Sequence, residues 1–588
     1  MHKSGNESGY YSPSIKKYIP QEYYIKWAEF LSENKIYFSF VYAIQHAPKG
    51  MDCHLTKETV SEIKKIAGKY FLGDILGETG SSFACKFEGY YNSGDGSFKD
   101  DYVPETDIPD MEAAHTKYIE FLNSYIYLAK KMDMPQIISV EATALNKYNL
   151  EAGTDISVLE LMCGNPELLV SFTRGGARAY DLKLWGTYVA HEWYGGMRHD
   201  DILKRKRLEL AYKYAYLSGS QIFCLESGDE AIGSYGQRHD KDSVLCREYQ
   251  KLISDFARFI KSDERPIGGP KVKVAFVQGN HDAWGGWGGS SLWNQFKRKE
   301  WGHGDAEHSW KLLEEIGAKR SWSDIANFGD NDLSVLPAYG MYDVIPSEAS
   351  KEFMCRYDYL IFVGWNSMTD EIYDKLLYYV SNGGKLLMTA AHLNYNTKRD
   401  NEFIPLDNKK LEELFGCRYS GNVISSNGGV KFEYESMSGL MYPGSKDKTC
   451  DPIYSSGYVS YMSCDVTTGV KTGVLSETFL NENEILPSVI ENKVGSGCAI
   501  LVTSINYPGN PSLYPLYRAI VREIITQSQR VCETKITSNG ALRYSVYEGD
   551  KIYLLNTDYD FPINVSIQTP QKTLETVLAP LELKTIQN

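Results

Sequence analysis

The first 230 residues alternate short apolar runs with amphipathic stretches. The amphipathic stretches repeat their apolar residues at helical spacing and predict helices at 21–33, 57–67, 111–131, 166–180 and 203–217. Such alternation is typical of parallel β/α units and favours a (β/α)₈-type TIM barrel. The apolar runs predict six clear strands, which makes the barrel short or incomplete, and a possible seventh strand at 81–91; the six lie at 35–43, 69–78, 135–144, 154–162, 184–196 and 220–230.

A charged and then Pro/Gly-rich segment at 261–271 follows a predicted helix at 240–261 and indicates a domain boundary. A second series of β/α units follows, with buried strands predicted at 272–279, 357–365, 384–391 and 497–505 and helices at 369–384 and 512–527. This pattern predicts a doubly wound, flavodoxin/amidotransferase-like domain, although no G-x-C-x-G elbow lies on its strands. The last 60 residues contain strands alone and predict a small antiparallel β domain. The expected domains are 1–268, 269–528 and 529–588.

Composition narrows the class of protein. A net charge of −14 in 588 residues argues against broad binding to nucleic acid or to anionic lipid, because both require a basic surface. The eleven cysteines are scattered, without a C-x-x-C pair, so a disulfide framework or a structural zinc site is not expected. The N-terminus lacks an apolar leader segment and no run of 18 apolar residues follows, which favours a cytoplasmic chain or a mature chain whose leader was removed.

Carboxylates stand at the ends of five predicted barrel strands. The active sites of such barrels form at this rim, because the loops that follow the strands converge there. Glycoside hydrolysis uses one carboxylic acid to protonate the leaving oxygen and one carboxylate to attack or to activate water. Trp193 and Tyr194 add aromatic surface on which a sugar ring can stack. The five are Glu78, Glu141, Glu160, Glu192 and Glu226; the plainer alternative is that they pair with Arg174, Arg178 or Arg198 and hold loops together.

Several segments resemble the glycoside hydrolase family 42 β-galactosidases with a trimerisation domain, or a related clan A family. WGTYVAHEWYGG, LELAYKYAYLSG and SQIFCLES are similar to the last two barrel strands of that group. VKVAFVQGNHDAWGG and YDYLIFVGWNSMTDEIYDKLLYYVSNGGKLLMTA are similar to its second domain. KIYLLNTDYDFPINVSI with LAPLELKTI is similar to its closing β domain. The likeness covers about residues 165–588, by pattern rather than by identity.

The resemblance implies a retaining exo-glycosidase that acts on an oligosaccharide or glycoside, needs no metal or other cofactor, and assembles as a homo-oligomer, by analogy a trimer. It assigns Glu192 as the nucleophile. The family usually carries Asn-Glu after the fourth barrel strand, and no Asn-Glu ends a barrel strand here. Glu160 and Glu141 therefore remain as candidates for the acid/base. We prefer Glu160, because one helix and the loop RGGARAYDLKLWG lead from it to the nucleophile strand. Glu78, Trp193, Tyr194 and Glu226 would bind the sugar.

A competing motif is GNHD at 279–282, which metal-dependent phosphoesterases use after a strand. Asp52 and His54 supply the upstream D-x-H of that class, but its middle G-D-x-x-D element is absent. We expect instead that the following loop brings Trp284 to the barrel mouth as a sugar-binding residue. A sugar phosphorylase or lyase, or an inactive carbohydrate-binding protein on the same architecture, also remains open.

Overall fold

The structure is a computed structural model of the 588-residue chain. It describes residues 11–12, 17–18, 20–41, 55–76, 80, 108–161, 164–190, 202–225, 244–286, 291–293, 295, 298–316, 336–400, 402–433, 436–442, 453, 455–477 and 483–587.

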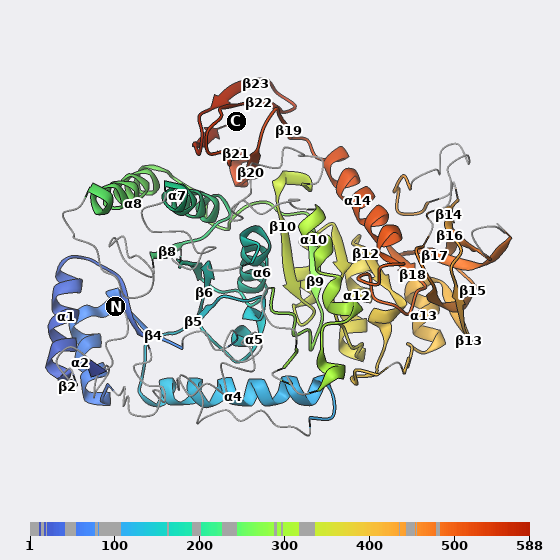
Figure 1. Ribbon diagram of the computed structural model, residues 1–588, viewed down its shortest axis with the longest axis horizontal. Coiled ribbons are helices and arrows are strands. Elements are labelled where there is room, and N and C mark those ends of the chain that lie inside the picture. Colours follow the sequence, from blue (N-terminus) through green and yellow to red (C-terminus); the bar gives the residue numbers. More distant parts are fainter. Residues whose placement is uncertain are drawn as a thin grey trace.

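A parallel sheet forms the first part of the molecule, at the left and centre of Figure 1. Its six described strands follow one another in chain order, as in a TIM barrel, and each coincides with one of the six predicted strands. The possible seventh strand, 81–91, lies outside the described residues. The strands are β3 (Phe38–Val41), β4 (Phe71–Ile75), β5 (Ile137–Glu141), β6 (Ile156–Leu161), β7 (Leu184–Val189) and β8 (Ile222–Leu225).

The helices around this sheet begin where capping residues predict. The side chains of Thr56 and Asp110 accept backbone N–H groups of α2 and α4, and Asn165 with Pro166 begins α6. These local signals explain why the predicted helix bounds agree with the structure to within a few residues. The helices are α1 (Gln21–Glu33), α2 (Lys57–Ala67), α4 (Met111–Lys131), α5 (Asn146–Glu151), α6 (Pro166–Ala179), α7 (Ile202–Leu217) and α8 (Val244–Ser262); a two-stranded pair, β1 (Tyr11–Ser12) and β2 (Lys17–Tyr18), precedes them.

The second part of the molecule is built on an eight-stranded mixed sheet in the order β10-β9-β11-β12-β18-β17-β16-β14. The first five of these strands are parallel to one another, which confirms the doubly wound arrangement. They are β9 (Val274–Gln278), β10 (Tyr342–Pro346), β11 (Tyr359–Phe362), β12 (Lys385–Thr389) and β18 (Gly497–Val502), with helices α9 (Asp305–His308), α10 (Lys311–Ile316), α11 (Lys351–Met354), α12 (Asp370–Ser381), α13 (Asn408–Phe415) and α14 (Tyr514–Arg530).

The sequence did not predict the antiparallel extension of this sheet. Strand β17 pairs antiparallel with β18 and carries β16 and β14 beyond it, while β13 and β15 pair separately. These strands mix exposed and buried residues and contain several register shifts, so a simple period-2 pattern is weak in them. The strands are β13 (Cys417–Ser426), β14 (Val430–Phe432), β15 (Val459–Val466), β16 (Val470–Ser476) and β17 (Glu484–Val494).

The chain ends in a small β domain at the top of Figure 1. Two three-stranded antiparallel sheets, β19-β22-β23 and β20-β21-β24, enclose an apolar core that includes Leu542, Val565 and Leu578. This confirms the antiparallel prediction and adds two strands, β19 and β23, to the four predicted. The strands are β19 (Lys535–Ser538), β20 (Leu542–Val546), β21 (Lys551–Asn556), β22 (Ile563–Gln568), β23 (Thr573–Leu578) and β24 (Leu583–Gln587).

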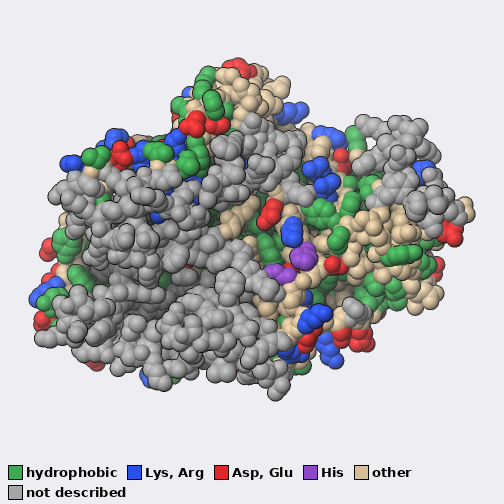
Figure 2. Space-filling view, in the orientation of Figure 1, with side chains coloured by type: hydrophobic (Ala, Val, Ile, Leu, Met, Phe, Trp, Pro, Cys, Tyr) green, Lys and Arg blue, Asp and Glu red, His purple; other side chains and the backbone are tan. Residues whose placement is uncertain are grey.

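The described surface shows acidic and basic side chains interspersed rather than gathered by sign on the face in Figure 2. No described helix combines the length and hydrophobicity that crossing a membrane requires. The described cysteines carry free thiols.

Candidate active site

The barrel interior is layered, and the register of the parallel strands sets the layers. Residues paired across parallel strands point to the same face, and alternate residues of a strand point to opposite faces. An apolar cluster of Ile138, Val140, Ile156 and Val158, with Leu184, Tyr188 and Ile222 packed against it, identifies the inner face. Toward the carboxyl ends of the strands the levels are Ile138/Ile156/Leu184, then Val140/Val158/Gly186/Ile222, then Glu160/Tyr188/Cys224.

Gly186 makes the middle level possible. A Cβ at this position would lie 2.4 Å from both Cβ and the carbonyl oxygen of Ile222. The absent side chain lets Ile222 fill the space between β7 and β8. The level below the rim is therefore closed by apolar groups.

Glu160 lies on the inner face directly above this apolar floor. It is the penultimate residue of β6, is 2% exposed, and pairs in register with Tyr188 of β7. Among the inward-facing residues of the strands as described, it is the one carboxylate. A carboxyl group at the carboxyl-end rim, over an apolar floor, lies where such barrels carry their chemistry.

Glu141 lies on the opposite face of the sheet. It pairs in register with Leu159, which belongs to the cluster that packs against the helices. Its Oε2 accepts the Gly80 backbone N–H at 2.6 Å, and its Oε1 accepts the backbone N–H and the hydroxyl of Thr143 at 3.2 and 2.7 Å. The donors satisfy both oxygens and tie Gly80 and the loop after β5 to the end of that strand.

The alternative, in which arginines pair with the strand-end glutamates, can be examined for Arg174 and Arg178. Arg174 and Arg178 of α6 both bind Asp343 of β10, at 2.6 and 3.0 Å. Both arginines therefore join α6 of the barrel to β10 of the second sheet. Arg198 lies outside the described residues.

Sequence reasoning missed Tyr188. Counting back in steps of two from Glu192 would have placed it on the same strand face. Cys224 completes this level, and burial raises the pKa of its thiol, which disfavours the thiolate that a nucleophile needs. Five predicted site residues, Glu78, Glu192, Trp193, Tyr194 and Glu226, lie outside the described residues.

Trp284 is described, and it lies at the junction between the barrel and the second sheet. Its ring stacks on Trp310 with a centroid distance of 5.5 Å and lies 6.0 Å from the ring of Phe172 in α6. It is 9% exposed, so little of the ring is accessible to a sugar in this conformation. The binding role of Trp284 stays a prediction.

The GNHD segment follows β9 and is used for packing. Asn280 Oδ1 accepts the Ser367 backbone N–H at 2.8 Å. His281 and His115 of α4 share a 2.9 Å contact between their Nδ1 atoms, and His115 Nε2 lies 3.0 Å from Glu151 Oε2. Burial, with the neighbouring His115, lowers the pKa of His281 to about 3, so this ring is neutral near pH 7.

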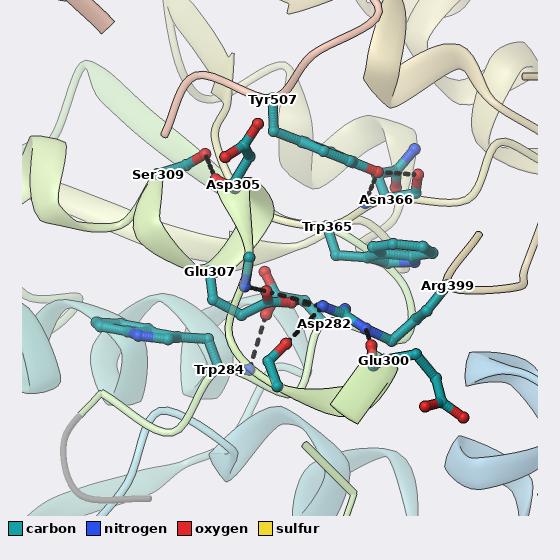
Figure 3. A network of polar contacts seen from close by, with 12 residues as sticks. Asp282, Trp284, Glu300, Asp305, Glu307, Ser309, Trp365, Asn366, Arg399 and Tyr507 are labelled. Atoms are coloured by element: carbon teal, nitrogen blue, oxygen red, sulfur yellow. Dashed lines mark hydrogen bonds and ion pairs between the residues drawn. The ribbon is translucent and has the colours of Figure 1, made fainter. Parts of the chain in front are cut away.

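Asp282 stands at the centre of the polar network in Figure 3. It accepts the Trp284 backbone N–H and the Trp310 indole N–H, each at 2.9 Å. Burial raises the pKa of Asp282 to about 7. Glu307 beside it accepts two hydrogen bonds from Arg399, at 2.9 and 3.1 Å.

This network occupies the edge where open α/β sheets usually bind ligands. The strand order changes direction between β9 and β11, and ligands of such sheets bind beyond the carboxyl ends of the strands at that point. Here Asp282 follows β9, Trp365 follows β11 and Arg399 follows β12, and Arg399 lies over the Trp365 ring. The chain fills the crevice with its own side chains. The described residues hold no group of three or more His, Cys, Asp or Glu that could bind a metal, while Asp52 and His54 lie outside them.

Comparison with solved structures places this geometry in a known fold. The structure is similar to a β-galactosidase from the Antarctic haloarchaeon Halorubrum lacusprofundi, with TM-score 0.57, 11% identity, and coverage of 97% of this chain and 92% of that chain. A cold-adapted β-galactosidase from Rahnella sp. R3 gives TM-score 0.53, 13% identity, and coverage of 97% and 90%. Gan42B, a GH42 β-galactosidase from G. stearothermophilus, gives TM-score 0.50, 13% identity, and coverage of 81% and 67%.

The chain therefore shares the fold of GH42 β-galactosidases: a barrel, a second α/β domain and a closing β domain. This confirms the resemblance that the sequence suggested. No family model matches the sequence, and no curated protein matches it.

Proposed function

We propose that the protein is a retaining glycoside hydrolase that cleaves a terminal sugar, in the manner of a β-galactosidase. The observation that carries the proposal is Glu160, a buried carboxyl on the inner face at the rim of a barrel whose fold is similar to that of a GH42 β-galactosidase. Tyr188, on the same face in register with it, supplies an aromatic hydroxyl beside the reacting groups.

The proposed reaction is a double displacement. Glu192 attacks the anomeric carbon while Glu160 protonates the glycosidic oxygen, so that the aglycone leaves and a glycosyl-enzyme ester forms. Glu160 then removes a proton from water, which attacks the anomeric carbon and releases both the sugar and Glu192. Glu78, Glu226, Trp193 and Tyr194 are proposed to bind the hydroxyls and the face of the sugar.

Glu160 suits the acid/base role better than Glu141. An acid/base must face the space where the substrate binds, and the register puts Glu160, not Glu141, on the inner face. Glu141 accepts three hydrogen bonds, one from Gly80 and two from Thr143 in the loop after β5. We therefore assign proton transfer to Glu160 and loop anchoring to Glu141.

The first test is a panel of p-nitrophenyl glycosides, with and without EDTA, and with p-nitrophenyl phosphate included. We expect EDTA-resistant release of p-nitrophenol from one glycoside, with the β-galactoside as the leading candidate. EDTA-sensitive release from the phosphate alone would contradict the proposal and favour the GNHD motif. Turnover that depends on added phosphate would indicate a sugar phosphorylase, and binding of oligosaccharides without turnover would indicate a binding protein.

The homo-oligomer, a trimer by analogy with the resemblance, belongs to this proposal. Light scattering coupled to size-exclusion chromatography measures it directly. A monomer at working concentration would contradict the assembly and would leave the proposed chemistry unaffected.

A further inference from the structure

Helix α6 connects the proposed acid/base to the rest of the molecule. It is the helix that follows β6, and its residues 166–177 are all buried. In Figure 1 it lies between the barrel strands and the strands β9 and β10 of the second sheet. It makes close contact with both β6 and β10. A helix in this position is held by partners from more than one domain.

The C-terminal β domain holds the beginning of α6. Arg543 of β20 directs its Nε toward both carboxylate oxygens of Glu167, each at 2.9 Å. The two side chains are each 6% exposed. A buried ion pair resists displacement, because separating it would leave an uncompensated charge away from water.

The second sheet holds the rest of α6. Asp343 of β10 accepts from Arg174, from Arg178 and from the Tyr357 hydroxyl, at 2.6, 3.0 and 2.7 Å. Burial by itself would raise the pKa of Asp343, but the two guanidinium charges and the Tyr357 hydrogen bond outweigh it and lower the pKa. Gly175 lets the helix approach β10 closely, since a Cβ there would lie 2.0 Å from the Val344 carbonyl oxygen.

Few residues of the chain separate the proposed acid/base, Glu160, from Glu167, the partner of Arg543. Glu160 is the penultimate residue of β6, and Glu167 is the second residue of α6. The Asn165 side chain accepts the Glu167 backbone N–H at 3.0 Å, which fixes the last part of the connection to the helix. If the first turn of α6 moved, we therefore expect most of that displacement to reach Glu160.

We propose that Arg543 is a positioning residue for Glu160. The guanidinium of the C-terminal domain fixes Glu167, and Glu167 fixes the strand-to-helix connection that sets the Glu160 carboxyl against the glycosidic oxygen. The inference rests on the proposed function. It gives the C-terminal β domain a catalytic purpose even though that domain contributes no residue to the proposed site.

The test compares Arg543→Met and Arg543→Lys with Lys206→Met. The control removes another ion pair to the same domain, Lys206–Asp560 at 2.7 Å, which comes from α7 and not from α6. Each variant is assayed on the glycoside identified by the panel, as an alkyl glycoside with a poor leaving group and as its 2,4-dinitrophenyl counterpart with a good one. Circular dichroism sets an assay temperature at which each variant is folded.

A misplaced general acid slows the poor leaving group most, because only that substrate needs the proton. We expect Arg543→Met to lower kcat/KM, which reports the glycosylation step, by about 10- to 100-fold on the alkyl glycoside, with a much smaller loss of kcat/KM on the dinitrophenyl glycoside. Arg543→Lys keeps the charge without the planar guanidinium, whose Nε reaches both Glu167 oxygens, and should fall between Arg543→Met and the wild-type enzyme. Lys206→Met should match the wild-type enzyme on both substrates.

An equal loss of kcat/KM on both substrates, or a loss no greater than that of Lys206→Met, would overturn the positioning role. If Arg543→Met does not fold, Arg543→Lys decides, and a wild-type leaving-group dependence in that variant would overturn it as well. A wild-type enzyme that turns over no glycoside would instead overturn the proposed function, and this inference with it.

Discussion

At the scale of single residues, the barrel interior depends on Gly186. We expect Gly186→Ala to destabilise the protein by about 1–3 kcal/mol, because the new Cβ would overlap Ile222 of the neighbouring strand. Urea unfolding followed by tryptophan fluorescence measures the change. Gly304→Ala is the control, since a Cβ there meets its nearest described atom at 3.6 Å. Equal stability of the two variants would contradict the layered interior.

A second residue-scale prediction concerns Asp282 and pH. Burial raises the pKa of Asp282 from 3.8 to about 7. Ionisation of this carboxyl therefore lowers the free energy of unfolding. This penalty is absent below pH 4 and complete above pH 7. We expect the stability of the wild-type protein relative to Asp282→Asn to fall as the pH rises from 4 to 7, measured by urea unfolding at each pH. A stability difference that does not change with pH would contradict the raised pKa.

At the scale of elements, neighbouring strands direct two similar carboxylates to opposite faces of the sheet. We expect Glu141→Gln to lower the free energy of unfolding by about 1–3 kcal/mol. Both Glu141 oxygens accept hydrogen bonds, and the amide nitrogen of Gln would place a donor against one of these donors. The turnover number of the folded variant should stay near the wild-type value. A large loss of turnover with unchanged stability would exchange the roles of Glu141 and Glu160.

Most elements could be predicted because their signals are local. The caps at Thr56, Asp110 and Asn165 and the buried runs of the parallel strands are all visible within about fifteen residues of sequence. Strand β10 was missed, since YDVIP is short and follows an irregular turn in which Tyr339 has a positive φ. The antiparallel strands β13 to β17 were missed because their partners, and not their own alternation, define them.

At the scale of the whole molecule, buried ion pairs join domains that are distant in sequence. Arg174 pairs with Asp343, and Glu167 pairs with Arg543 376 residues away. No sequence pattern identifies such partners, and the one pairing considered for the α6 arginines, as an alternative, was with strand-end glutamates. The rim carboxylates themselves could be proposed from strand ends, but separating Glu160 from Glu141 required the register of β5 and β6.

The contact between α6 of the barrel and β10 of the second sheet leads to a prediction at this scale. Asp343→Asn leaves the buried Arg174 and the partly buried Arg178 without a counter-charge, and we expect a loss of about 3–5 kcal/mol in the free energy of unfolding. Differential scanning calorimetry and urea unfolding at pH 7 measure it. The exposed pair Lys251–Asp255 provides the control, because Asp255→Asn should change stability by less than about 1 kcal/mol. Equal effects would show that Asp343 does not hold the barrel to the second sheet.

The most direct test of the central claim measures the leaving-group dependence of Glu160→Gln on the glycoside that the wild-type enzyme hydrolyses. If Glu160 is the general acid, kcat/KM for an alkyl glycoside should fall by about 10²–10⁴-fold. The value of kcat/KM for the 2,4-dinitrophenyl glycoside, whose leaving group departs without a proton, should fall far less. Activity of Glu160→Gln within tenfold of the wild-type enzyme on both substrates would contradict the assignment.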